Sequence, residues 1–528
     1  MRLINHPTAC RFLQVFMLGP LAFVAASCHT TTTGQDVTTP NILIIYADDL
    51  GYGDVSAYGQ GQIQTPNIDK LAASGVRFTN GYATSATCTP SRLALLTGTY
   101  PWRNENAKIL PGDAPLLIDT ASVTLPDLLK KEGYATGVVG KWHLGLGSGN
   151  VDWNRAIAKT PNDLGFDYSY IMAATNDRVP TVFVENRNVV GLTAGDPLLV
   201  SYEKNFPGEP TAVTNPELMT RMKWHHGHNQ SVHNGIPRIG YMKGGKSALW
   251  KDELMAETFL AKATAFIDSH LAKKNGQPFF LYYALNQPHV PRVPGARFVG
   301  KSGLGPRGDA VLEADWCVGE IMKKLKEAGL TNNTLVIFSS DNGPVLNDGY
   351  YDDAVEKNGT HTPWGQFRGG KYSLLEAGTR VPFSVSWPGR IKAAVSDALI
   401  CQLDLFSSIA SLVGSTASTT DSQNLLGTLL GTSETGRANL VLEASGRLAF
   451  RSGNWLLIPP YPGKPVNEQV QLETGLSPSP QLYNLRSDPG QQKNLAQSLP
   501  DKLTEMQKQM KQVVGDGYQA NTGELQLH

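Results

Sequence analysis

The chain has 528 residues, of which 41% are hydrophobic and 17% charged, and its 46 Lys and Arg balance its 46 Asp and Glu to a formal net charge of zero. This balance excludes the broad basic surface with which proteins hold nucleic acid, so we expect no nucleic-acid partner. The length predicts one large core and a smaller second unit.

The first 28 residues predict an export signal. Arg2 and Arg11 give a positive start, and residues 12–26 form an apolar run that is too short for a transmembrane helix. Small residues directly before Cys28 resemble a bacterial lipobox. We therefore expect a signal peptide with a lipobox over 1–28, a polar tether over 29–39, and a periplasmic or cell-surface lipoprotein that touches the membrane only through a lipid anchor. Plain signal cleavage near the same point is the alternative.

Four apolar runs each end in polar residues able to do chemistry: "NILIIYADDL" (41–50), "ATGVVGKWHLG" (135–145), "PFFLYYALNQPH" (278–289) and "NTLVIFSSDNG" (333–343). Continuous apolar runs of this length are typical of strands covered on both faces. Helical patterns precede three of them, at 126–132, 253–270 and 309–328. The alternation predicts an α/β fold with a doubly wound, mostly parallel sheet.

Ligands bind outside the carboxyl ends of the strands in open sheets of this kind. We therefore expect the polar residues that end the four runs to converge on one rim. They are Asp48, Asp49, Lys141, His143, His289, Asp341 and Asn342.

The remaining segments predict loops and a second domain. Residues 147–250 are rich in Gly, Pro and Asn, which favours long loops over the active edge of the sheet. After residue 414, "STASTTDSQ" is typical of a linker. We expect a catalytic domain over 40–414 and a C-terminal α+β subdomain over 415–528, in which "ANLVLEA", "RLAFRSG" and "NWLLIPP" form an antiparallel sheet and residues 501–514 a helix.

Three cysteines remain after the signal, and this odd number argues against a disulfide framework. Cys317 follows a helical apolar pattern and Cys401 lies in an apolar stretch, which predicts packed structural thiols. Cys88 alone stands in a polar, turn-like context. It precedes a helical pattern with Pro90 in the first turn, and we expect the helix N-terminus to lower its thiol pKa and to favour an anionic substrate.

The acidic residues of the rim predict a metal site. Asp48, Asp49, Asp341 and Asn342 offer only hard oxygen ligands, a set that prefers calcium or magnesium to zinc. The flexible set favours one calcium ion.

"CTPSRLALLTG" (88–98) resembles the signature of the type I sulfatases, a family of the alkaline phosphatase superfamily. "YADDLGYGD", "GVVGKWHLG", "SDNG", "RGGKYSLLEAGTRVP" and "QLYNLRSDPGQQKNLA" fit the same family in the same order. The resemblance implies an alkaline phosphatase-like sheet with a smaller C-terminal domain, and it implies sulfate ester hydrolysis. It also implies that a formylglycine-generating or anaerobic sulfatase-maturing enzyme oxidises Cys88 to formylglycine, whose hydrate is the nucleophile.

The same resemblance implies the metal ligands. Calcium would be held by Asp48, Asp49, Asp341 and Asn342 and would also contact the formylglycine derived from Cys88.

It further implies the catalytic side chains around that ion. Arg92 and His143 would orient and activate the hydrate, Lys141 and Lys371 would bind sulfate, and His289 would protonate the leaving oxygen.

Substrate recognition is expected from two loop segments. Asp177 and Arg178 in "AATNDRVP" could grip one sugar hydroxyl from both sides, the alternative being an exposed pair. In "WHHGHNQSVHNG" (224–235) we expect His225 or His226 to contact substrate, with an exposed loop or a second metal site as alternatives. "ATNDRVPTVFVEN" and "HNGIPRIGYMKGGK" resemble bacterial glycan sulfatases acting on 6-O-sulfated galactose or N-acetylgalactosamine.

Two rival functions remain open at this point. One is a metal-dependent phosphatase or phosphodiesterase on the same fold, although such sites use Ser or Thr with a His-rich two-zinc set. The other is a glycan-binding lipoprotein whose Cys88 is never converted.

Overall fold

The computed structural model describes residues 39–59 and 61–515. The predicted signal peptide with its lipobox, and the predicted tether up to residue 38, lie outside the described residues. Among the helices of the described ranges, none combines the length and the apolar character that crossing a membrane requires.

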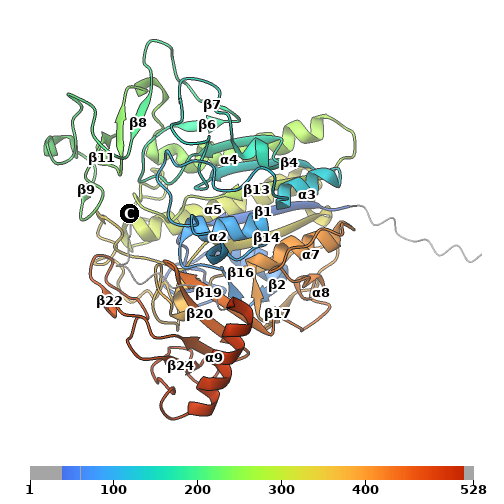
Figure 1. Ribbon diagram of the computed structural model, residues 1–528. Helices are drawn as coiled ribbons and strands as arrows, with labels where there is room; N and C mark the ends of the chain where they lie inside the picture. Colours follow the sequence, from blue (N-terminus) through green and yellow to red (C-terminus); the bar gives the residue numbers. More distant parts are fainter. Residues whose placement is uncertain (1–38, 60, 516–528) are drawn as a thin grey trace, which may run out of the picture. The chain divides into compact units, whose positions relative to one another are not determined.

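The four apolar runs form neighbouring parallel strands at the centre of a ten-stranded sheet (Figure 1). Their order is β14-β1-β13-β4, and every pair among them is parallel. The prediction of a mostly parallel sheet is confirmed. Their bounds are Asn41–Ala47 for β1, Ala135–Lys141 for β4, Phe279–Ala284 for β13 and Thr334–Ser340 for β14.

Further strands extend the sheet at both edges and make it mixed. On one side β5 (Tyr168–Met172) is parallel to β4, and β6 (Phe183–Glu185) and β7 (Asn188–Val189) follow antiparallel. On the other side β16 (Phe383–Ser386) is antiparallel to both β14 and β2 (Gly75–Phe78). The outermost strand there, β17 (Ala394–Ser396), is parallel to β2.

Helices cover both faces of the sheet. The side chains of β1 from Ile42 to Ile45 are apolar and point alternately to the two faces, so both faces must be buried. Ile42 and Ile44 belong to one core cluster, whereas Leu43 and Ile45 belong to another. The first cluster contains residues of α2 (Cys88–Thr97), α3 (Leu125–Lys131), α7 (Leu405–Leu412) and α8 (Leu426–Leu429). The second contains residues of α1 (Pro66–Ala73), α4 (Met255–Ala272) and α5 (Gly305–Glu327).

The three predicted helices correspond to α3, α4 and α5, with ends that differ by one to four residues. Local chemistry explains the start of α3, where the Thr124 side chain accepts a hydrogen bond from the backbone N–H of Asp127 and Pro126 fits the first turn. Helix α5 begins four residues earlier than predicted, at Gly305, with Pro306 again in its first turn. Turn residues at the start of a helix show no apolar periodicity, so the sequence pattern underestimates the length of the helix.

The segment predicted as long loops contains short strand pairs. Strand β8 (Leu199–Ser201) pairs with β12 (Tyr241–Lys243), and β10 (Val232–His233) pairs with β11 (Ile236–Pro237). Strand β9 (Lys223–Trp224) pairs with β15 (Tyr350–Tyr351), which ties this segment to the loop after β14. Strands of two or three residues are too short to produce a recognisable alternation.

The C-terminal antiparallel sheet is also confirmed. Its order is β19-β20-β21-β24, and the first three strands are the predicted ones. Their bounds, with that of the unpredicted fourth, are Asn439–Ala444, Arg447–Ser452, Trp455–Ile458 and Gln481–Asn484. The closing helix α9 (Pro500–Val514) buries Met506 among the apolar residues of this sheet.

The remaining elements are short. Strand β3 (Gly81–Tyr82) pairs with β18 (Ile400–Cys401), β22 (Val466–Asn467) pairs with β23 (Leu472–Glu473), and α6 spans Glu376–Thr379.

Candidate active site

The strand ends deliver charged side chains to one rim, where they form buried ion pairs. Asp48, directly after β1, receives hydrogen bonds from Lys141 Nζ at the end of β4, at 2.6 and 2.7 Å. Asp49 Oδ1 accepts a hydrogen bond of 2.7 Å from Asn342 Nδ2, which follows β14. The expected convergence of these residues is therefore present in the fold.

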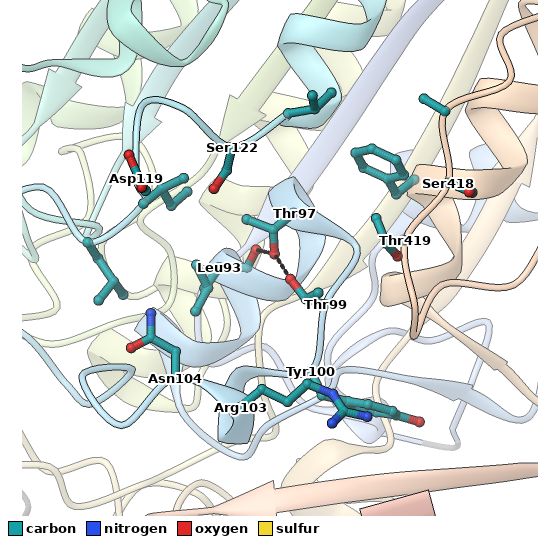
Figure 2. Close-up of a pocket in the computed structure, with 15 residues that line it drawn as sticks. Leu93, Thr97, Thr99, Tyr100, Arg103, Asn104, Asp119, Ser122, Ser418 and Thr419 are labelled. Atoms are coloured by element: carbon teal, nitrogen blue, oxygen red, sulfur yellow. Dashed lines mark hydrogen bonds between the residues drawn. The ribbon is translucent and has the colours of Figure 1, made fainter.

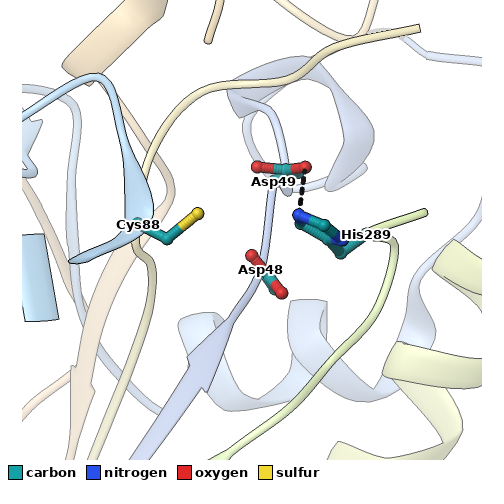
Figure 3. A group of neighbouring side chains, drawn as sticks. All are labelled: Asp48, Asp49, Cys88 and His289. Carbon is teal, nitrogen blue, oxygen red and sulfur yellow. Dashed lines mark ion pairs between the residues drawn. The ribbon is translucent and has the colours of Figure 1, made fainter. Parts of the chain in front are cut away.

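Cys88 is the first residue of α2, and its side chain points at the same rim (Figure 3). One potential ligand atom from each of Asp48, Asp49, Cys88 and His289 lies within 4.8 Å of all the others, and all four residues are buried. The described cysteines Cys88, Cys317 and Cys401 are free thiols.

The thiol of Cys88 differs from the expectation in one respect. Burial raises its pKa to about 12, although the nearby Lys141 and Lys371 ammonium groups act to lower it. The desolvation of a side chain that is 1% exposed outweighs both lysines and the helix N-terminus. The thiol is therefore neutral at ordinary pH and is a weak nucleophile in this form.

Arg92 lies one turn after Cys88 and is fully buried. Its Nε and Nη2 donate to Asp341 Oδ2 at 3.0 and 2.7 Å, and its Nη1 donates to the Tyr282 hydroxyl at 3.2 Å. These bonds fix the guanidinium beneath the rim and fix one carboxylate oxygen of Asp341 with it.

Lys371 connects the rim to a residue that the sequence analysis missed. Its Nζ lies 2.9 Å from Asp49 Oδ2, 2.8 Å from Asp348 Oδ2 and 3.3 Å from His289 Nε2. Burial raises the pKa of Asp348, but the Lys371 ammonium more than offsets it, so the net pKa lies well below its usual range. Tyr372 adds a hydrogen bond of 3.2 Å to the same carboxylate.

A sequence signal for these two residues existed. Asp348 stands six residues after Asn342 in "DNGPVLNDG", and Tyr372 directly follows Lys371.

The two predicted catalytic histidines present unprotonated nitrogens at the rim. His143 Nε2 faces the backbone carbonyl of Leu110 at 3.0 Å and must donate, whereas its Nδ1 is buried with no hydrogen-bond partner within the described ranges. His289 Nδ1 faces the Val290 carbonyl at 2.7 Å, which leaves Nε2 toward Lys371. Burial lowers the pKa of both imidazoles well below the usual value, and neighbouring lysines lower it further.

Three residues of this site have left-handed backbone conformations. Asp49, His143 and Tyr372 have φ values of 60°, 56° and 70°. Non-glycine residues adopt this region at an energetic cost, and such strain clusters at functional sites.

Asp177 and Arg178 lie in the same pocket and are buried, at 3% and 5% exposure, so the exposed-pair alternative does not hold. Arg178 Nη1 donates to both oxygens of Asp177 at 3.1 and 2.9 Å, and the Thr175 hydroxyl donates to Oδ1. Burial raises the pKa of Asp177, but Arg178 and further donors bring it well below the usual range.

The histidine-rich segment contacts this pair through His228. Its Nε2 lies 2.8 Å from Asp177 Oδ2. His225 and His226 instead bring their Nδ1 atoms to 2.8 Å of each other, and neither is among the residues lining the pocket.

Two pockets compete as the site, and chemistry decides between them. A pocket of about 660 Å³ at the C-terminal end of α2 is lined mainly by hydroxyl and apolar residues, with Arg103, Asn104 and Asp119 among them, and the Thr97 and Thr99 hydroxyls lie 2.7 Å apart in it (Figure 2). Its lining includes none of the predicted site residues. The smaller pocket is lined by Cys88, Ile109, His143, Asp177, Arg178, His289, Asp348, Lys371 and Tyr372.

The rim fits a hard cation. Asn342 Oδ1 is buried and has no hydrogen-bond partner in the described part of the chain, as expected of an oxygen that faces an ion. Burial raises the pKa of Asp48, so this carboxylate gains from a further positive charge. At the rim four carboxylates face three cationic side chains, namely Asp48, Asp49, Asp341 and Asp348 against Arg92, Lys141 and Lys371. A divalent cation would turn this excess of one negative charge into an excess of one positive charge, which favours binding of an anion.

Known proteins with similar sequences and structures show the family of this chain. A family model described as Sulfatase matches residues 40–415. An N-acetylgalactosamine-6-O-sulfatase of Bacteroides thetaiotaomicron is 51% identical over 485 residues, covering 91% of this chain and 94% of the relative. Bovine arylsulfatase A is 32% identical, with coverages of 90% and 87%.

A solved structure described within the glycosaminoglycan metabolism of Bacteroides thetaiotaomicron superposes with a TM-score of 0.88. It shares 51% identity, and the match covers 90% of this chain and 99% of that one. Together with the signature around Cys88 and the oxygen-rich rim, these matches assign the chain. It belongs to the sulfatase family and is a sulfuric ester hydrolase.

Proposed function

We propose that this sulfatase removes a 6-O-sulfate from galactose or N-acetylgalactosamine in a sulfated glycan. The observation that carries the sugar assignment is the buried pair of Asp177 and Arg178 in the pocket of Cys88 and Lys371. Arg178 Nε is buried without a hydrogen-bond partner among the described residues, so a sugar oxygen at that atom would satisfy it. The activity of the 51% identical Bacteroides relative supports the same sugar class.

In this proposal residue 88 acts after conversion of Cys88 to formylglycine. Its aldehyde hydrate supplies the nucleophilic hydroxyl in place of the buried thiol. His143 Nδ1, buried and free to accept, would take a proton from the group at position 88. Arg92, fixed by Asp341, orients that group from one turn along α2.

The metal in this proposal is one calcium ion held by Asp48, Asp49, Asp341 and Asn342, with residue 88 beside them. It would supply positive charge to the sulfuryl oxygens as charge develops. The carboxylate and amide donors favour calcium, whereas the sulfur of Cys88 and the imidazole of His289 would suit zinc if the cysteine stayed unmodified.

The remaining charged residues would bind sulfate and complete the reaction. Lys141 and Lys371 extend their ammonium groups to the rim and would bind two sulfate oxygens. His289, whose imidazole has a lowered pKa and is therefore a strong acid once protonated, would give a proton from Nε2 to the leaving sugar oxygen. His225 and His226, in the segment of His228, would contact more distant parts of the glycan.

We further propose that the chain is exported to the periplasm or cell surface, is held by a lipid on Cys28, and is matured by a formylglycine-generating or anaerobic sulfatase-maturing enzyme. The division into a catalytic domain over 40–414 and a C-terminal subdomain over 415–528 is part of the same proposal. It is supported by the separate sheet of β19, β20, β21 and β24.

A substrate panel tests the function. We expect sulfate release from 6-O-sulfated galactose and N-acetylgalactosamine, less from 6-O-sulfated N-acetylglucosamine, in which the 4-hydroxyl is equatorial, and none from the 4-O-sulfated sugars. Ion chromatography measures the released sulfate. Release of phosphate from the matching phosphomonoesters at equal rates would favour the phosphatase alternative, and binding without turnover would favour the glycan-binding one.

A further inference from the structure

His228 bridges two acceptor oxygens deep in the pocket wall. Its Nε2 lies 2.8 Å from Asp177 Oδ2, and its Nδ1 lies 2.9 Å from the backbone carbonyl oxygen of His226. A carbonyl can only accept, and so can a carboxylate that stays ionised. Both acceptors face ring nitrogens of a side chain that is only 1% exposed, and Nε2 donates to the Asp177 carboxylate.

The surrounding backbone is built to hold this ring. Gly349 has φ +97°, and a Cβ there would lie 1.9 Å from His228 Nδ1, so this position is restricted to glycine. The Tyr350 ring packs against the imidazole with centroids 4.4 Å apart. The preceding residue, Asp348, bonds Lys371, so one short loop seats both His228 and a sulfate-binding lysine.

The orientation of Asp177 depends on this histidine. Its Oδ1 accepts from Thr175 and Arg178, and its Oδ2 accepts from Arg178 and His228. Thr175 and Arg178 belong to the same loop as Asp177, whereas His228 comes from a segment 51 residues away. Backbone contacts such as Ile239 N–H to the Asp177 carbonyl also hold this loop, but among the described residues it is His228 that reaches the Asp177 carboxylate from outside the loop.

We propose that His228 is a positioning residue for substrate selection, holding the Asp177–Arg178 pair in the geometry that grips a sugar hydroxyl. The inference rests on the proposed function and extends it, because it assigns sugar specificity to a residue outside the predicted contacts. A small aryl sulfate, which has no such hydroxyl, does not use this geometry. Loss of His228 should therefore separate the two substrate types.

The test compares His228→Ala and His228→Gln on a 6-O-sulfated galacto-configured sugar and on a small aryl sulfate. His228→Ala should lower kcat/KM on the sugar by roughly 10- to 100-fold, the range for losing a charge-assisted hydrogen bond, and should leave the aryl sulfate within about threefold. His228→Gln should recover part of the loss, because its amide can still donate to Asp177. His270→Gln is the control, since this buried α4 histidine bonds the Gln277 carbonyl at 2.7 Å and does not line the pocket.

Equal losses on both substrates, or no loss on either, would overturn the proposal. Nitrogen NMR of labelled histidine supplies a second readout, in which the His228 Nε2 that faces Asp177 should carry a proton, and a bare Nε2 would contradict the proposal. If the enzyme without any substitution cleaves no galacto-configured sugar sulfate, the proposed function fails. The proposed function stands if the enzyme cleaves that sugar sulfate. If Asp177→Ala then lowers kcat/KM on the sugar but not on the aryl sulfate, while His228→Ala shows no such difference, only this inference fails.

Discussion

Glu443 accepts a hydrogen bond from the Ser85 hydroxyl, three residues before Cys88. The contact is reinforced by the backbone, because Ala86 N–H donates to the Glu443 carbonyl at 2.8 Å and Glu443 N–H donates to Thr84 at 3.0 Å. The Ser85 hydroxyl also lies 3.0 Å from the hydroxyl of Thr87, the residue that precedes α2. Strand β19 of the C-terminal sheet thus supports the start of helix α2, which begins at Cys88.

We predict that Glu443→Ala lowers kcat on sugar and aryl sulfates by the same factor, roughly several-fold to tenfold, because it loosens the start of α2 and leaves the sugar contacts in place. Glu443→Gln should retain most activity, since its amide oxygen can still accept from Ser85. Steady-state kinetics on both substrates measure the effect. A loss confined to sugar substrates would place Glu443 in substrate recognition instead.

Metal removal gives the second prediction. The purified enzyme should contain about one calcium per chain, and chelation should abolish turnover that calcium restores. Asn342→Ala should weaken calcium binding, because it deletes a buried amide oxygen that has no hydrogen-bond partner within residues 39–59 and 61–515. The control variant is Asp421→Asn, which changes an ion pair with Arg103 outside the pocket and should leave calcium binding unchanged. Stoichiometric zinc with chelator-resistant activity would contradict the calcium assignment.

Asp177→Ala should lose most activity on a galacto-configured sugar sulfate and keep most of it on a small aryl sulfate. Removing the carboxylate deprives Arg178 of the partner that orients it and costs roughly 1 to 3 kcal/mol of transition-state binding. The ratio of kcat/KM values for the two substrates measures the effect. A parallel loss on both would instead make Asp177 part of the catalytic centre.

A buried carboxylate near the first strand predicts an acid-dependent loss of stability. Burial raises the pKa of Asp54, but Arg307, at 2.6 and 2.8 Å, and His361, at 2.9 Å, bring it down to about 2 from the ordinary 3.8. A depressed pKa stabilises the fold at pH values above 3.8, and this contribution of roughly 2 kcal/mol disappears as the pH falls through about 2.

Asp54→Asn should therefore be less stable than the natural chain at neutral pH, and the difference should shrink as the pH falls below about 4. Chemical unfolding of both proteins over a pH series measures it. A difference that stays constant down to pH 2 would show that the ion pair contributes nothing.

The sequence predicted the strands and the rim because their signals are local. Each buried strand is a continuous apolar run, and the residues that follow it must lie at the carboxyl edge of a parallel sheet. Asp348, Tyr372 and His228 were not predicted as site residues, because they reach the pocket through loops whose path depends on tertiary packing. Glycine at 349, which the close approach of His228 requires, reads in the sequence as an ordinary turn residue.

The sequence predicted a lowered pKa for the Cys88 thiol, and the structure shows a raised one. The sequence places the thiol at a helix N-terminus, which favours a thiolate, but it does not reveal that the side chain is 1% exposed. Desolvation depends on everything packed around the residue, and here it dominates.

We predict that residue 88 of the active enzyme is formylglycine. Conversion of the cysteine lowers the mass of the peptide containing residue 88 by about 18 Da, since the CH2SH group becomes an aldehyde. Mass spectrometry of a digest of active protein should find that shift, and Cys88→Ala should fold normally but lack turnover. A fully active preparation in which residue 88 is only the unmodified thiol would contradict the account.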